Sequence, residues 1–182
     1  MASRSTARAA RSGAAARGFS PGSGFLSDPT LGAARLSGSY AVTGVVSTAI
    51  GVPGEAPGQQ VTRSWTLTPA CPTGPCALVG LRRQRVGATD SLTLRRVAPG
   101  LYQGAGRFTA PVQCHGRVYP AGAWVPYRIT LIVTAAVRTA DGSLMATGFT
   151  ATYAGGPHIG RTRCFQPPTH DAAAYSGVLA GG

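Results

Sequence analysis

The chain of 182 residues contains no lysine and no asparagine, and it has only five carboxylates. All 17 basic residues are therefore arginine, and the net charge is +12. The lack of asparagine excludes N-glycosylation, since every acceptor site begins with that residue. The all-arginine composition fits a GC-rich genome, and it also fits selection for bidentate anion binding. Composition does not separate these two explanations.

Patterns that would indicate an enzyme are also scarce. No two of the five carboxylates lie close together in the sequence, so a glycosidase site with paired carboxylates has no support. The Cys-x-x-Cys spacing of a redox dithiol is missing. Cys114 and His115 are neighbours, but neighbours on a strand point to opposite faces. We therefore predict a non-enzymatic protein that needs no cofactor and no metal.

Long apolar runs are missing as well. A transmembrane helix needs about 20 mostly apolar residues, and no such stretch occurs. Arginines interrupt every apolar stretch up to Arg17, so no export signal is visible. Residues 1–37, rich in Arg, Ala and Ser, are expected to form a disordered arm or linker outside the fold. An organellar transit peptide is the alternative, and we favour a linker or truncated start because the rest of the chain has the features of an exported protein.

The four cysteines bear on the compartment. They are Cys71, Cys76, Cys114 and Cys164. An even count in a small, loop-rich domain favours a disulfide framework and hence an oxidising, extracytoplasmic location. The turn sequence between Cys71 and Cys76 can bring that pair together, so we expect the bonds Cys71–Cys76 and Cys114–Cys164. A zinc site, formed by the four thiolates or by three of them with His115, and free buried thiols are the alternatives.

Past residue 38 the sequence consists of short β-rich segments separated by turn formers. Gly and Pro together make up 40 of the 182 residues of the whole chain, and no amphipathic helix is evident. We predict an all-β domain over residues 38–165. It is expected to be a roughly eight-stranded antiparallel meander closed as a lipocalin-like barrel, with a β-sandwich as the alternative. Residues 166–182 have little to bury and are expected to form a flexible tail.

The clearest hairpin lies between residues 127 and 153. Its centre, Asp141-Gly142, is a dipeptide that favours a two-residue type I′ turn. Such a turn places Ala140 opposite Ser143. By the two-residue period of a strand, Phe149 and Tyr153 then fall on the face away from the core.

One segment resembles a known kind of domain. The sequence from Trp65 to Cys76, Trp-Thr-Leu-Thr-Pro-Ala-Cys-Pro-Thr-Gly-Pro-Cys, is similar to a segment of exported, disulfide-containing β-domains of unknown function from actinobacteria. There a Trp-bearing strand leads to a Cys…Gly-x-Cys turn, with two later cysteines. The resemblance covers residues 38–165 and implies an extracytoplasmic domain of the cell envelope. The chain departs from the pattern because it shows no export signal and no lipobox cysteine.

Two groups of residues are candidates for binding. Six arginines on three successive predicted strands form a candidate anion-binding patch: Arg82, Arg83, Arg85, Arg95, Arg96 and Arg107. They would serve as a docking face for acidic wall polymer or anionic lipid headgroups, or as a solvated basic edge that discourages aggregation. We do not expect a nucleic-acid partner. A candidate groove comprises Trp65, Tyr102, Trp124 and Tyr127.

The sequence as a whole predicts a non-enzymatic extracytoplasmic binding or sensing module of the cell envelope. It names neither the ligand nor the oligomeric state. The alternative is a structural envelope domain with a packed core and no ligand. The two differ in whether the barrel interior is filled.

Overall fold

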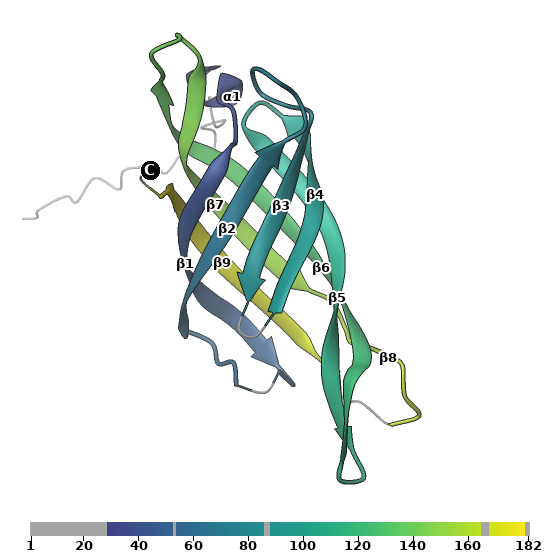
Figure 1. Cartoon of the computed structure of the whole chain (residues 1–182). Helices are drawn as coiled ribbons and strands as arrows, with labels where there is room; N and C mark the ends of the chain where they lie inside the picture. The colour runs from purple at the N-terminus through teal and green to yellow at the C-terminus, as the bar shows by residue number, and fades with distance from the viewer. Residues whose placement is uncertain (1–28, 53, 86–87, 165–167, 181–182) are drawn as a thin grey trace, which may run out of the picture.

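The chain forms a closed antiparallel β-barrel (Figure 1). The computed structural model describes residues 29–52, 54–85, 88–164 and 168–180. In this part of the chain, eight strands follow one another around the barrel, and pairing of the fifth with the sixth completes the ring. These strands are β1 (Gly38–Ile50), β2 (Gln60–Pro69), β3 (Leu78–Arg85), β4 (Ala88–Ala98), β5 (Leu101–Cys114), β6 (Arg117–Arg138), β7 (Leu144–Gly155) and β9 (His170–Leu179). The predicted eight-stranded meander and lipocalin-like barrel are confirmed.

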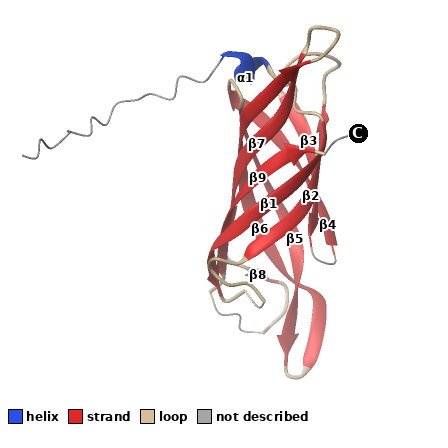
Figure 2. Cartoon of the chain, turned by 90° about the vertical axis from the view of Figure 1, so that its left-hand side faces the viewer, coloured by secondary structure: helices blue, strands red, loops and turns tan. Residues whose placement is uncertain are grey.

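Two further elements distinguish the ends of the barrel (Figures 1 and 2). The short helix α1 (Pro29–Ala33) lies at one end, which we name the α1 end. At the other, β5 and β6 continue past the barrel as a projecting hairpin, and we name this the hairpin end. The two-residue strand β8 (Ile159–Gly160) pairs with β6 there. No helix of the described residues is long and apolar enough to span a membrane.

Large apolar side chains fill most of the barrel interior. The ring of Trp65 stacks on that of Phe149, with centroids 5.5 Å apart, and Tyr40 lies 5.0 Å from Phe149 on another side. Tyr40 donates a hydrogen bond of 2.7 Å to the carbonyl oxygen of Ala146, and burial raises its pKa to about 12. Gly177 makes room for this cluster, because a Cβ there would lie 2.2 Å from the Phe149 ring.

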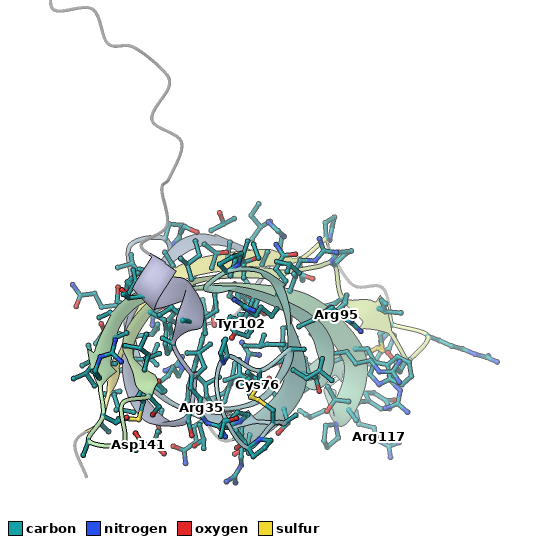
Figure 3. The ribbon with its side chains drawn as sticks, turned by 90° about the horizontal axis from the view of Figure 1, so that it is seen from above. Arg35, Cys76, Arg95, Tyr102, Arg117 and Asp141 are labelled. Atoms are coloured by element: carbon teal, nitrogen blue, oxygen red, sulfur yellow. A yellow bond between two sulfur atoms is a disulfide. The ribbon has the colours of Figure 1, made fainter. Side chains whose placement is uncertain are left out.

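The α1 end is closed by the segment that follows the helix. Leu36 is fully buried in the core, and the backbone of Arg35 exchanges two hydrogen bonds with β7, at 2.8 and 2.9 Å. Seen down the barrel in Figure 3, Arg35 and Cys76 lie within the ring of strands. The predicted domain start at residue 38 is therefore wrong, because residues 29–37 are part of the fold. The predicted disorder of residues 1–28 concerns a segment outside the described residues.

The predicted flexible tail is also wrong. Residues 170–179 form β9, which pairs with β1 on one side and β7 on the other and so closes the barrel. Half of this strand is Ala, Ser and Gly, which bury little area by themselves, and Gly177 leaves space for the ring of Phe149. Of the predicted tail, residues 166–167 and 181–182 lie outside the described part.

The predicted register of the β6–β7 hairpin is off by one residue. The turn contains a single left-handed residue, Gly142, and Arg138 pairs with Leu144. Thr139 and Ser143 therefore face each other, rather than Ala140 and Ser143. A one-residue slip moves every side chain to the other face of the sheet. Phe149 and Tyr153 accordingly point into the core.

The type I′ geometry occurs instead at the tip of the projecting hairpin. His115 and Gly116 both have positive φ, of 49° and 75°, between the paired residues Cys114 and Arg117. His115 is the one non-glycine residue with positive φ among the described residues. Two central residues with positive φ match the right-handed twist of the flanking strands.

Both expected disulfides are present. Cys71–Cys76 closes a turn at the α1 end, with the Cα atoms 5.5 Å apart. Cys114–Cys164 ties the hairpin tip to the segment after β8, with the Cα atoms 6.0 Å apart. All four cysteines are therefore disulfide-bonded, and none is available as a zinc ligand or as a free thiol. Two disulfides indicate an oxidising environment outside the cytoplasm.

Candidate functional site

The six arginines of the predicted patch do not share one face. Arg83 and Arg85 point into the barrel at its hairpin end, whereas Arg82, Arg95 and Arg107 are exposed on the outside. The cause is the two-residue period, which sends strand neighbours to opposite sides of the wall. The predicted basic patch therefore does not form as one surface.

Arg96, the sixth member, has a structural role at the α1 end. One of its terminal guanidinium nitrogens donates a hydrogen bond of 2.8 Å to the carbonyl oxygen of Gly32. Gly32 lies in α1, so this contact fixes the helix to β4. Its buried Nε has no hydrogen-bond partner among the described residues.

The predicted groove residues do not come together either. Trp65, Tyr102 and Tyr127 are buried inside the barrel, with Tyr102 within the ring when it is viewed from the α1 end in Figure 3. Trp124 lies outside, beneath the guanidinium groups of Arg107 and Arg161, at 4.0 and 5.1 Å from its ring centre. No groove joins these four residues.

A pocket of about 200 Å³ opens inside the hairpin end of the barrel. Charged and aromatic side chains line it together, and the lining comprises Glu55, Arg63, Trp65, Arg83, Gln84, Arg85, Phe108, Tyr153, Asp171 and Tyr175. The described residues contain four carboxylates, and two of them, Glu55 and Asp171, face this pocket. A third, Asp90, lies beneath its arginines. Most of the acidic groups of a very basic chain thus gather at one place.

Arg83 and Asp90 form the buried base of the pocket. They lie directly opposite each other on β3 and β4, and the guanidinium group donates two hydrogen bonds to the carboxylate, of 2.8 and 2.7 Å. Their side chains are only 5% and 8% exposed. The Arg83 guanidinium also lies over the rings of Tyr127 and Tyr153, at 4.2 and 5.2 Å. Burial alone would lower the pKa of Arg83, but hydrogen bonding and the charge of Asp90 outweigh burial and raise it.

Arg85 completes the cationic side of the pocket. Its Nε lies 3.0 Å from the same Asp90 carboxylate, but the N–H is not aligned for a hydrogen bond. Its guanidinium covers the ring of Phe108 at 3.7 Å. Among the described residues the Arg85 guanidinium makes no hydrogen bond, so Arg85 keeps unused donors. Arg63 also keeps unused donors, because its only hydrogen bond within the described residues is to the carbonyl oxygen of Thr62.

Two half-buried carboxylates form the acidic side. The hydroxyl of Tyr153 donates a hydrogen bond of 3.4 Å to Asp171, and the side-chain carboxylate of Glu55 has no hydrogen bond or ion pair to another described residue. Burial raises the pKa of Asp171, and burial together with the charge of Asp171 raises the pKa of Glu55. Burial also lowers the pKa of His158. The pocket therefore offers free acceptors opposite the free donors of Arg63 and Arg85.

A larger hollow of about 510 Å³ lies against the wall formed by β1, β9, β7 and β6. Its lining is mostly Thr, Ala, Val and Ile, with no charged residue. Because it offers no charged group to fix a ligand, we take the smaller charged pocket as the candidate site.

The chain matches no family model, no curated protein and no solved structure. The site is therefore defined by its own geometry. Arg83, Arg85 and Trp65 of this site are among the residues predicted from the sequence, whereas Asp90, Glu55, Arg63 and Asp171 are not. Arg83 faces Asp90 because Arg85 pairs with Ala88, two residues closer to the end of each strand. Glu55 and Asp171 come from distant segments, and no sequence signal joins them.

Proposed function

We propose that this protein is a non-enzymatic binding module that takes a small polar ligand in the pocket at the hairpin end. The observation that carries the proposal is the clustering of three arginines and three carboxylates in and beneath one pocket of an otherwise apolar barrel. Small-molecule sites combine an apolar wall with a few convergent polar groups, and this pocket has both.

The energetics favour a functional origin for this cluster. Desolvation of two charges offsets most of their attraction, so a buried ion pair is weak evidence of selection for stability. The raised pKa values of Glu55 and Asp171 mean that their ionised forms are disfavoured in the folded protein. Titratable groups perturbed by burial inside a cleft are typical of functional sites.

The lining limits what the ligand can be. A volume of about 200 Å³ is below the range of about 300–1,000 Å³ of pockets for drug-sized molecules, so the ligand is small. Unused donors on Arg63 and Arg85 face unused acceptors on Glu55 and Asp171. The ligand therefore carries both acceptors and donors, as amino acids and monosaccharides do, and Trp65 and Phe108 add apolar atoms to the lining.

We favour binding over catalysis because of the residue types in the pocket. Guanidinium groups stay protonated at neutral pH and do not act as general bases. The described lining residues include no Cys, Ser or His, so Glu55 and Asp171, which could transfer protons, have no such nucleophile beside them. The proposed location is the cell envelope, which is supported by the disulfides and by the resemblance to exported actinobacterial domains.

Thermal unfolding in the presence of candidate ligands tests the proposal. We expect one class among amino acids, small dicarboxylates and monosaccharides to raise the melting temperature by about 5–10 °C at a hundredfold excess over Kd. Arg85→Gln should abolish this gain, whereas Arg82→Gln on the outer face of the same strand should retain it. If no compound stabilises the protein, or if both variants respond alike, binding in the pocket is contradicted.

A structural envelope domain without a ligand is the second candidate. The observation in its favour is the core around Trp65 and Phe149, whose stacked rings are almost completely buried. This second function predicts that apolar substitutions of the pocket residues change the stability of the protein and nothing else.

A further inference from the structure

We propose that the outer surface of the hairpin end docks the protein on an anionic lipid bilayer. The inference is independent of the pocket, because it concerns side chains on the outside of the wall. Its basis is a group of arginines with neighbouring aromatic and exposed aliphatic residues, on β5, on β6 and around β8.

Trp124 lies at the centre of this surface. It is partly exposed on β6, with the guanidinium of Arg107 from β5 at 4.0 Å and that of Arg161 at 5.1 Å from its ring centre. The backbone N–H of Arg161 donates to the carbonyl oxygen of Gly122, which keeps this arginine against β6. Such stacking holds each guanidinium in place and leaves most of its N–H donors free for an external acceptor.

A second arginine–aromatic pair lies toward the tip of the hairpin. The guanidinium of Arg117 lies 5.4 Å from the ring centre of Tyr119. The disulfide Cys114–Cys164 joins this tip to the segment that carries Arg161. The disulfide therefore fixes the segments that carry the two arginine clusters relative to each other, at the projecting hairpin of Figures 1 and 2.

No carboxylate of the described residues neutralises these arginines. Both ion pairs within the described residues are made by Asp90, and Glu55 and Asp171 face the pocket. The remaining described carboxylate, Asp141, lies in the β6–β7 turn at the α1 end. This surface thus presents unpaired guanidinium groups, which bind phosphate oxygens in a bidentate manner.

Exposed apolar residues indicate which anion is bound. Val118 on the hairpin and Ile159 on β8 are 58% and 54% exposed. A soluble polyanion gives such side chains nothing to contact, whereas the boundary between headgroups and acyl chains does. Arginine next to Trp, Tyr and exposed aliphatic residues is the composition of a surface that lies in a membrane interface. We therefore assign the partner as the phosphate headgroups of an anionic bilayer rather than an acidic polymer.

Vesicle co-sedimentation of the full chain tests this assignment. Phosphatidylcholine vesicles with roughly a third phosphatidylglycerol should retain the protein, and pure phosphatidylcholine vesicles should not. Arg107→Gln combined with Arg161→Gln should weaken retention about thirtyfold, since each basic residue near the surface contributes about fivefold. The matched control, Arg82→Gln with Arg95→Gln, removes the same charge elsewhere. It should change retention less than about twofold at physiological salt, because screening is effective beyond about 8 Å.

The apolar residues decide between a bilayer and a polymer. Val118→Ser with Ile159→Ser should reduce retention on vesicles and leave binding to soluble polyphosphate unchanged. No retention on anionic vesicles, equal losses from the two arginine pairs, or unchanged vesicle binding of the Val118/Ile159 variant would each overturn the proposal. Whether a pocket ligand still raises the melting temperature of the Arg107/Arg161 variant tests the pocket separately from the membrane surface.

Discussion

Replacing Asp90 by Asn gives the sharpest test of the charged cluster. The substitution keeps the shape of the side chain and removes its charge, so the Arg83 guanidinium stays buried without a counterion. The Arg85 guanidinium loses the same partner, with its Nε 3.0 Å from Asp90. Both strands otherwise remain as they are, because the backbone pairing of Arg83 with residue 90 does not involve the side chain.

The expected magnitude follows from this burial. Breaking a buried ion pair by removing one partner costs about 3–5 kcal/mol. The contacts of Arg83 with the rings of Tyr127 and Tyr153 persist, so we expect the lower part of that range, about 3 kcal/mol. For a chain of this size this lowers the melting temperature by roughly 6–12 °C. Arg82→Met, on the exposed face of the same strand, should stay within about 0.5 kcal/mol of the wild type.

A double variant separates stability from function. Arg83→Met with Asp90→Leu removes both charges and fills similar volume, and such replacements are often neutral or stabilising. Urea unfolding followed by tryptophan fluorescence, to which Trp65 and Trp124 both contribute, measures all three variants. A cost below about 1 kcal/mol for Asp90→Asn, or a double variant as unstable as the single one, would refute the reasoning. A stable double variant that no longer responds to ligand would separate the two roles.

Four further changes test other parts of the structure. Asp171→Asn should raise the melting temperature at neutral pH. In the folded protein the pKa of Asp171 lies above its ordinary value of 3.8, so the stability of the wild type falls as the pH rises from the ordinary pKa through the folded pKa. A series of melting curves from about pH 3 to pH 7 should show that the variant loses its advantage at the acidic end. Gly177→Ala places a methyl group 2.2 Å from Phe149 and should cost about 1–3 kcal/mol by urea unfolding, whereas Gly80→Ala, with its nearest neighbour at 3.5 Å, should cost much less. Cys114→Ser with Cys164→Ser opens a separation of 50 residues and should cost about 4 kcal/mol, against about 2 kcal/mol for Cys71→Ser with Cys76→Ser; equal costs in chemical denaturation would contradict the loop-entropy argument. His115→Asn should stabilise the protein by up to about 1 kcal/mol, because Asn tolerates the left-handed conformation better, and a lower melting temperature would count against the turn geometry described above.

The barrel could be predicted from the sequence because its signals are local. Strand-forming segments separated by Gly, Pro and Asp specify successive hairpins, and successive hairpins make a meander. The pairing of the cysteines also followed from a short turn sequence. The predicted register of β6 and β7 was wrong because Gly142 is the only residue of the turn with positive φ. The turn is therefore one residue longer than the Asp-Gly dipeptide suggests. That one residue put Phe149 and Tyr153 on the wrong face.

The candidate site was harder to predict, for a different reason. In strand β9, Gly177 is needed because the ring of Phe149 on β7 lies against it, and this information lies in β7 rather than in β9 itself. Missing β9 meant missing Asp171, and with it the acidic side of the pocket. The arginines were noticed, but their division between the inside and the outside of the barrel depends on registers that the sequence specifies only once all pairings are known.

Side-chain NMR of the arginines tests the central claim most directly. The Nε–Hε resonances of Arg63, Arg83 and Arg85 should shift on addition of the small polar compound that stabilises the protein, and those of Arg82 and Arg95 should stay in place. Shifts confined to the outer arginines, or no shifts at saturating concentrations of the compound, would contradict a ligand site inside the barrel.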